Sequence, residues 1–268
     1  MTLSVSGKVA IVTGAAHGIG HAIARHFRAK GARVMFADAD EAALIRELGD
    51  AAHTDGSSRW FSTDLRRRLD VSNLVSATLE AFGRVDILIN AEHHYALSDP
   101  LAPHDETTAE LWALNVQSAL MLTQQVARRM ILQSQDDPDQ GPAGAIITLS
   151  STAARRTQGE LLAYAMANAA LEQMTRSMAV ALAPHRIRVN GIAFGSVMGS
   201  TLQAALKERP DWREEIRLAT PLGRIASPNE VTEAAQFLAS EGAGFVTGQI
   251  LTIDGGRSLL DAARPSAH

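Results

Sequence analysis

The sequence predicts an α/β fold, namely a doubly wound parallel sheet of about seven strands with helices on both faces. Three observations lead to it. Short apolar runs of strand length alternate along the chain with longer segments of helical periodicity. The short runs are almost continuously apolar, as strands buried on both faces require. Regular alternation of this kind implies right-handed crossovers between parallel strands.

The seven expected strands are short apolar runs. The first, KVAIVT, ends at Gly14, and the third is the weakest of the set. The strands are expected at 8–13, 32–37, 59–63, 85–89, 145–149, 186–193 and 249–253.

The expected helices carry apolar residues three and four positions apart, as Ile19 and Ile23 show for the first. One helix stops at Gly83, a later one ends near Pro184, and the last has Pro228 in its first turn. The helices are expected at 19–30, 41–48, 71–82, 111–132, 163–182 and 228–239.

Length and composition are compatible with one domain over residues 1–268. The polar stretch 133–144 reads as a surface loop rather than a domain boundary, and 195–227 as a loop region with short helices. The tail at 261–268 is expected to be loosely held.

Charge and cysteine content narrow the function classes. The formal net charge is -4 without a long basic run, so we expect neither nucleic acid nor an anionic membrane as a partner. The chain has no cysteine, which excludes disulfides, thiolate catalysis and cysteine zinc sites. No apolar run approaches the ~20 residues of a membrane span, and the start lacks a signal-peptide cleavage site. We therefore expect a cytoplasmic protein.

Three glycines lie between the first strand and the first helix, in the run TGAAHGIG at 13–20. Gly14, Gly18 and Gly20 permit a tight turn, and the helix N-terminus then presents unpaired N–H groups to a pyrophosphate. His17 and Ile19 belong to the same candidate phosphate-binding turn. The glycines also suit a tight connection alone, but the strand–turn–helix context favours a dinucleotide site.

Asp38 follows the second strand, about 20 residues beyond the glycines. A carboxylate there can accept hydrogen bonds from the adenosine ribose and would repel a 2′-phosphate, which favours NAD over NADP. A solvated acid or a helix cap is the alternative, and Asp40 and Arg33 nearby leave the assignment open.

The run TGAAHGIG resembles the TGxxxGIG motif of the short-chain dehydrogenase/reductases, and the resemblance extends from Lys8 to the ending LTIDGG at 251–256. It implies a Rossmann fold and hydride transfer between NAD(H) and an alcohol or ketone substrate, in a homo-oligomer (tetramer or dimer). The positions that match further cofactor-binding residues of the family are Asp64, Leu65, Asn90, Ala91 and Val197.

The resemblance also implies the catalytic residues. Ser151 lies 13 residues before Tyr164, the family's interval, and Asn115 matches the family's helix asparagine. In the family the serine bonds the substrate oxygen, the tyrosine transfers the proton and contacts the cofactor, and the asparagine helps to hold a water. Each residue taken alone also fits a helix cap, a core side chain or a local backbone bond.

The family's YxxxK motif reads YAMAN here, so that Asn168 takes the place of the lysine. Residues four apart share a helix face, so position 168 lies beside the phenol. A tyrosine pKa near ~10 leaves only about one phenol in 10³ ionised at neutral pH. A cation near 4 Å lowers that pKa by roughly 3 units at an effective dielectric of ~20. We expect strongly impaired proton transfer unless another cation substitutes.

Two further departures lie close by in the expected fold. NAEH at 90–93 replaces the family's NNAG, which places His93 at the glycine position, followed by His94. Three interpretations of this pair are open: it lends the missing cation, it crowds the cofactor ribose, or it forms an exposed loop. We expect no metal site, because the sequence shows no third ligand. Phe194 replaces the proline of the family's PG, where it fills the pocket wall, and Gly199 takes a threonine position.

The resemblance assigns 195–227 to the substrate side of the site. Its apolar side chains suggest a lid, although a subunit contact or ordinary packing explains them equally: Leu202, Leu206, Trp212, Ile216 and Leu218. For the whole chain, the first interpretation is an oxidoreductase impaired by loss of the lysine. The alternative is a non-catalytic nucleotide-binding homologue that acts as a subunit or sensor. A third, a partner protein without cofactor, is opposed by the glycine turn and Asp38.

Overall fold

The structure, a computed structural model, describes residues 3–49, 56–135, 141–156 and 158–261. Seven strands form one parallel sheet in the order β3-β2-β1-β4-β5-β6-β7, which confirms the predicted fold class. The strands are β1 (Val9–Thr13), β2 (Arg33–Asp38), β3 (Ser58–Ser62), β4 (Ile87–Asn90), β5 (Gly144–Ser151), β6 (Ile187–Phe194) and β7 (Ile250–Ile253).

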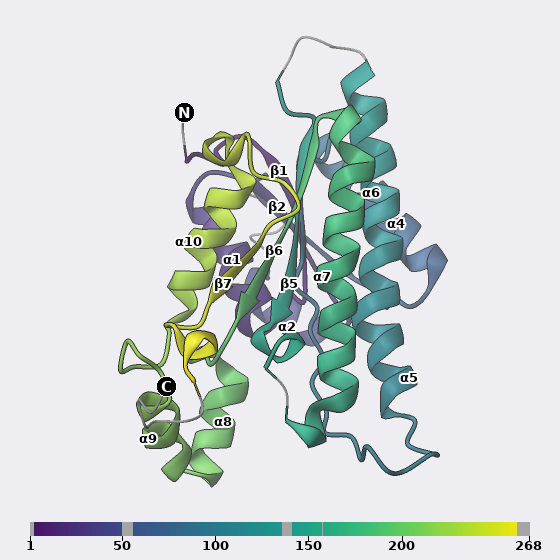
Figure 1. Cartoon of the computed structure of the whole chain (residues 1–268). Helices are drawn as coiled ribbons and strands as arrows, with labels where there is room; N and C mark the ends of the chain where they lie inside the picture. The colour runs from purple at the N-terminus through teal and green to yellow at the C-terminus, as the bar shows by residue number, and fades with distance from the viewer. Residues whose placement is uncertain (1–2, 50–55, 136–140, 157, 262–268) are drawn as a thin grey trace.

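Helices cover both faces of the sheet (Figure 1). One layer contains α1 (Gly18–Ala29), α2 (Glu41–Leu48) and α10 (Pro228–Ala239), and the other contains α4 (Arg68–Phe82), α6 (Ser118–Gln135) and α7 (Leu162–Leu182). Alternate strand residues enter opposite cores because side chains along a strand point to opposite faces. Ala10 and Val12 pack under the first layer, whereas Val9 and Ile11 pack under the second.

The predicted helix 111–132 is wrong in one respect, because it is three segments rather than one. α5 (Thr107–Leu111) leads into a π-helical turn, η1 (Trp112–Gln117), and α6 follows directly. A π turn accommodates one extra residue without ending the helix, so a pattern of apolar spacing does not disclose it. The turn contains Asn115, which is buried.

The carboxyl ends of the strands meet at the lower edge of Figure 1, beside α8 (Ser200–Glu208) and α9 (Asp211–Leu218). These two helices lie within the 195–227 region. Of the five apolar side chains named for a lid, Leu206 is buried, but Trp212 and Leu218 are exposed. The two helices therefore contribute few side chains to the core.

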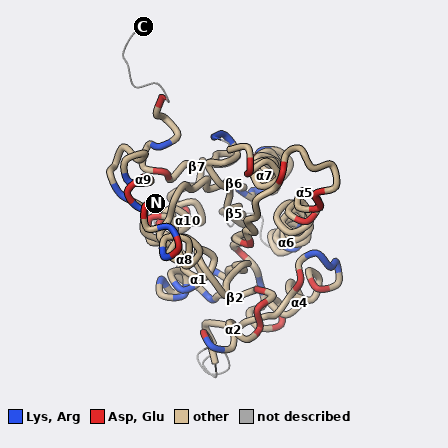
Figure 2. The backbone as a smooth tube through the Cα atoms, turned by 90° about the horizontal axis from the view of Figure 1, so that it is seen from below, with Lys and Arg blue, Asp and Glu red and all other residues tan. Residues whose placement is uncertain are grey.

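Viewed from below, the sheet runs between the two helix layers, and Lys and Arg are interspersed with Asp and Glu around the rim (Figure 2). No helix within the described ranges is long and apolar enough to cross a membrane. The expected loose tail falls mainly on 262–268, and part of the expected surface loop on 136–140; both stretches lie outside the described residues.

Candidate active site

The glycine turn is shaped by a close approach of two backbone segments at the ends of β1 and β4. Gly14 has φ +59°, and a Cβ placed on it would lie 2.8 Å from the carbonyl oxygen of Ala91. A Cβ on Gly20 would overlap the carbonyl oxygen of Gly14. Both positions therefore require glycine because of the packing of the turn itself, whatever it binds.

The N-terminus of α1 is open toward that turn. His17 precedes the helix without a capping side-chain bond, and the first turn contains no acidic residue. The leading N–H groups of a helix have no partner within the helix and carry partial positive charge. A Cβ on Gly18 would meet no atom within 4 Å, so there is space beside these groups. This arrangement fits the pyrophosphate of a dinucleotide.

The structure separates the two acids near the end of β2. The Asp38 carboxylate accepts hydrogen bonds from the backbone N–H groups of Ala16 and Asp40, both at 3.0 Å, and so lies against the glycine turn. Asp40 instead caps α2 by accepting the N–H of Ala43 at 2.9 Å, and it pairs with His17 at 2.8 Å. These contacts hold the pKa of Asp40 below its usual value. Asp38 is therefore the acid that faces the candidate nucleotide site.

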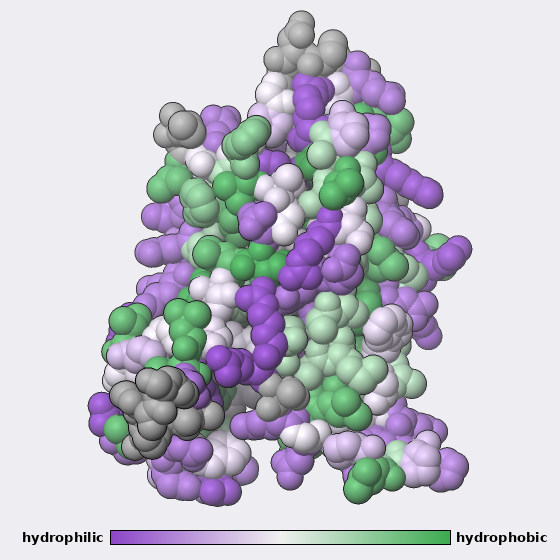
Figure 3. Space-filling model, viewed as in Figure 1, coloured by the Kyte–Doolittle hydropathy of each residue, from purple (hydrophilic) through white to green (hydrophobic). Residues whose placement is uncertain are grey.

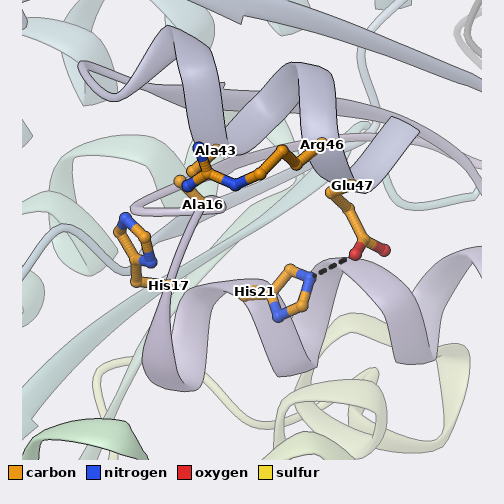
Figure 4. Close-up of a pocket in the computed structure, with 6 residues that line it drawn as sticks. All are labelled: Ala16, His17, His21, Ala43, Arg46 and Glu47. Atoms are coloured by element: carbon orange, nitrogen blue, oxygen red, sulfur yellow. Dashed lines mark ion pairs between the residues drawn. The ribbon is translucent and has the colours of Figure 1, made fainter. Parts of the chain in front are cut away.

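A pocket of about 260 Å³ lies beside this turn, between α1 and α2 (Figure 4). His21 points toward Glu47 across it and forms an ion pair at 3.0 Å. Arg46 and His17 bring further basic groups to its rim. The pocket also touches Ala16, whose N–H bonds Asp38, so it adjoins the place expected for the adenosine ribose.

The other predicted cofactor residues lie at the same edge of the sheet. Asp64 follows β3 and forms a two-point ion pair with Arg66 at 2.8 and 2.7 Å, which lowers the pKa of Asp64, while Leu65 is buried. Val197 is buried and forms a β-bridge with Ala226.

The segment after Val197 reaches the first helix. A Cβ on Gly199 would lie 4.0 Å from the Cδ1 of Ile19. The loop after β6 therefore passes close to the start of α1.

Asn90 has its amide directed into the fold. Its Nδ2 donates to the hydroxyls of Thr123 at 2.9 Å and Thr148 at 3.4 Å, and the residue is buried. Thr13, which the sequence did not single out, accepts the N–H groups of Ala91 and Glu92, each at 3.0 Å. The only feature of the sequence that could have indicated this role of Thr13 is a hydroxyl side chain directly before the glycine turn. Together these contacts fix the chain that leaves β4.

Ser151 and Tyr164 are brought together at the ends of β5 and α7. The Ser151 hydroxyl accepts the N–H of Ala153 at 3.1 Å and so caps a short 3₁₀ turn. Tyr164 lies in the first turn of α7 and is buried. Burial raises the pKa of Tyr164 to about 12, although hydrogen bonding by Ser151 and Asn168 opposes the rise.

Asn168 is fully buried on the same face of α7, one turn after Tyr164. Its Nδ2 donates to the carbonyl oxygen of Tyr164 at 2.8 Å, while its Oδ1 is buried without a hydrogen-bond partner among the described residues. The guanidinium groups of Arg155 and Arg176 are engaged one turn further on, each 3.1 Å from the buried Glu172 carboxylate. An unused buried oxygen beside the phenol fits a ribose hydroxyl of a bound nucleotide.

The two histidines after β4 behave differently from each other. His93 Nε2 forms a hydrogen bond with the Tyr164 hydroxyl, so His93 is not the exposed loop residue that one interpretation expected. Burial, and to a smaller extent the charge of His94, lowers the pKa of His93 to about 4, which means that it does not supply the missing cation at neutral pH. His94 is exposed, and its bond to Glu92 at 3.0 Å raises its pKa.

Asn115 holds the same loop. Its Oδ1 accepts the N–H of His94 at 2.8 Å, and its Nδ2 donates to the carbonyl oxygen of His94 at 2.9 Å. Both ends of the side-chain amide therefore hold the backbone of the loop. Within the described part of the chain there is no cluster of three or more potential metal-ligating residues.

Known proteins are similar to this chain in both sequence and fold. A family model described as "Enoyl-(Acyl carrier protein) reductase" matches residues 14–258. The 7alpha-hydroxysteroid dehydrogenase of Escherichia coli (strain K12) is 33% identical over 257 residues, which cover 95% of this chain and 95% of that protein.

Two solved structures show the range of nucleotides among the relatives. A 7alpha-hydroxysteroid dehydrogenase complexed with NADH and 7-oxo glycochenodeoxycholic acid has a TM-score of 0.84 at 32% identity, covering 95% of each chain. A gluconate 5-dehydrogenase from Burkholderia cenocepacia J2315, in complex with NADP and tartrate, has a TM-score of 0.85 at 27% identity and covers 97% of this chain and 98% of its own. Relatives of this chain thus include complexes with each nucleotide.

Proposed function

The chain belongs to the short-chain dehydrogenase/reductase family, and on that basis we propose that it transfers a hydride between a nicotinamide dinucleotide and an alcohol or ketone. The observation that carries the proposal is the placement of Tyr164 beside Ser151 at the edge of the sheet that also holds the open end of α1. When bound, the nucleotide supplies or accepts the hydride.

The dinucleotide is proposed to lie along the glycine turn, with its pyrophosphate at the α1 N-terminus and its adenosine ribose at Asp38. NAD is favoured over NADP because a 2′-phosphate there would face the Asp38 carboxylate, which two backbone N–H groups hold in place. The neighbouring basic groups at the Figure 4 pocket, His17 and Arg46, are the feature that favours NADP instead. Titration of the protein with NADH and with NADPH decides between them.

Tyr164 is proposed to donate its proton to the carbonyl oxygen as hydride arrives, while the Ser151 hydroxyl holds that oxygen. With a pKa of about 12, the phenol is protonated throughout the neutral range, which is the form that carbonyl reduction uses. Alcohol oxidation uses the phenolate. As long as the pH stays below that pKa, the phenolate fraction increases about tenfold for each unit by which the pH rises. We therefore expect reduction to be nearly independent of pH from 7 to 10 and oxidation to rise steeply over the same range.

The second candidate is a non-catalytic homologue that binds the nucleotide as a subunit or sensor. The burial of Asn168 in place of a lysine favours it, because an amide beside the phenol supplies no charge. Both candidates require nucleotide binding, so calorimetry with NADH and NADPH comes first. If neither nucleotide binds, both fail.

Hydride transfer separates the two candidates. The relatives named above suggest a panel of cyclic ketones, including steroid ketones, and of sugar-acid ketones, assayed with the nucleotide that binds. Turnover by the native protein supports the oxidoreductase. If only Asn168→Lys turns over a ketone, while the native protein binds the nucleotide and remains inactive, the non-catalytic candidate is correct.

We also propose that the chain is one domain and assembles as a homo-oligomer, a tetramer or dimer. Apolar side chains lie among polar ones on the outer face of α7 (Figure 3). Met166 and Val180 of this helix are exposed. Burial of such residues against a second copy would remove them from water. Sedimentation at micromolar concentration tests this, and a monomer at all concentrations would contradict it.

A further inference from the structure

We propose that His93 acts as a neutral hydrogen-bond donor to the oxygen of Tyr164 and so stabilises the phenolate in place of the absent lysine. The inference rests on the proposed function, because it assigns a role within that reaction. The feature that carries it is a residue which the family pattern does not place at the phenol. His93 Nε2 and the Tyr164 hydroxyl form a hydrogen bond between two segments 71 residues apart.

Aromatic neighbours fix the orientation of the imidazole. Its ring lies edge-on to Tyr164, with centroids 5.2 Å apart and an interplanar angle of 83°. Phe194 packs against it at 5.7 Å from the end of β6. Edge-to-face packing directs the Nε2 edge of the imidazole at the phenol and leaves little freedom to turn away. Phe194, which stands at the family's proline position, thus forms the wall behind His93.

The backbone on both sides of His93 is tied down by buried side chains. Thr13 accepts the N–H groups of Ala91 and Glu92, and Asn115 bonds both the N–H and the carbonyl oxygen of His94. Four hydrogen bonds therefore flank a single residue. A side chain supported in this way keeps its position when a substrate or nucleotide arrives.

The environment of the second ring nitrogen selects the tautomer. His93 Nδ1 is buried and has no hydrogen-bond partner among the described residues. A proton on Nδ1 would be a buried N–H without an acceptor, which is rare, whereas a bare Nδ1 acceptor is tolerated more often. The proton of the neutral ring therefore resides on Nε2, which donates to the Tyr164 oxygen. The hydroxyl proton of Tyr164 remains available to a carbonyl oxygen.

The proposed step conserves atoms and charge. When bound, the reduced nucleotide would supply the hydride that forms a C–H bond at the carbonyl carbon. The Tyr164 proton passes to the carbonyl oxygen, which yields the alcohol and leaves a phenolate. The N–H of His93 then donates to that phenolate, and a proton from solvent restores the phenol. His93 stays neutral throughout and exchanges no proton. A bond of this charge-assisted kind raises the phenolate fraction by about 10- to 100-fold.

The chain contains two tyrosines, so Tyr95→Phe leaves Tyr164 as the sole tyrosine for spectroscopy. In that background, tyrosine ¹³Cζ NMR follows the ionisation of Tyr164 with and without His93→Phe, and circular dichroism reports whether the fold persists. The titratable groups facing Tyr164 are His93 and Tyr95, with His94 acting on His93. Burial without any help from His93 sets the pKa of Tyr164 at about 12. We expect the native pKa to lie one to two units below that value, and His93→Phe to return it to about 12. His94→Gln, the matched control, should leave the native pKa nearly unchanged.

A second measurement at neutral pH needs no alkaline titration. In ¹⁵N-histidine-labelled protein, the signal of His93 is identified by its loss in His93→Gln. We expect a neutral ring with the proton on Nε2 from pH 5 to 8. A proton on Nδ1, a charged ring at pH 6, or an unchanged Tyr164 pKa in His93→Phe would overturn the inference.

The two proposals fail separately. If neither nucleotide binds while NMR shows the expected tautomer, the proposed function is wrong and the hydrogen bond remains a structural feature of the fold. If the native protein reduces ketones and His93→Phe does so at the same rate with the same pH profile, the proposed function holds and the role of His93 is wrong.

Discussion

The depressed pKa of His93 predicts a specific loss of stability in acid. An unfolded histidine binds a proton as the pH falls through about 6.5, whereas the folded protein does not protonate His93 until about pH 4. In that window the unfolded state holds more protons, so the free energy of unfolding falls as the pH falls. The difference of about 2.5 pH units, at about 1.36 kcal/mol per unit, amounts to about 3 kcal/mol.

Urea denaturation of the native protein and of His93→Gln, each at pH 8, 6, 5 and 4, measures this contribution. We expect the stability advantage of the native protein over the variant to shrink by about 3 kcal/mol between pH 8 and pH 4. Contributions to the free energy of unfolding that the two proteins share cancel in the difference. His104→Gln, an exposed site, is the control that should track the native protein. Parallel curves for the native protein and His93→Gln would show that His93 is not held neutral, and the reasoning would fail.

Three more predictions concern the turn and the loop. Gly14→Ala should lower the free energy of unfolding by about 2 to 4 kcal/mol, and Gly18→Ala, its control, by about 1 kcal/mol. Both glycines have positive φ, but only the new Cβ at position 14 would meet a carbonyl oxygen at 2.8 Å. Thermal melts of the two variants measure the difference. Asp38→Asn should narrow the preference for NADH over NADPH by about 10-fold, measured by calorimetry. Asn115→Ala should cost about 2 to 3 kcal/mol, measured by urea denaturation, because it leaves the His94 backbone groups unpaired.

Local pattern was sufficient for most of the fold. Strand and helix positions follow from apolar spacing, and the observed boundaries of α2, at 41–48, and α10, at 228–239, coincide with the predicted ones. β5 extends to Ser151, two residues beyond its prediction, because it pairs with β6 as far as Phe194. Pairing across the sheet is a tertiary effect, and the spacing of one segment does not contain it.

The candidate site was only partly predictable, for a similar reason. The intervals that join Ser151 and Tyr164 are local to the β5–α7 unit, so their proximity follows from the sequence once the motif is seen. The contact between His93 and Tyr164 depends on how β4 and β5 lie side by side and on the course of the loop after β4. From the sequence, the His93–His94 pair could lend a cation, crowd the cofactor ribose or form an exposed loop. The burial of His93, which only the packed structure shows, makes its ring neutral.

The π turn at Trp112–Gln117 makes the geometry of the site sensitive to chain length. Leu111 and Val116 are five residues apart and both buried, a separation that an ordinary helix would place on different sides. Deleting one residue from the turn would convert it to regular α-helix and rotate the preceding segment by about 100° relative to α6. The amide of Asn115 would then lose its hydrogen bonds to the backbone of His94. The loop that carries His93 would lose this support, although neither His93 nor Tyr164 had been substituted.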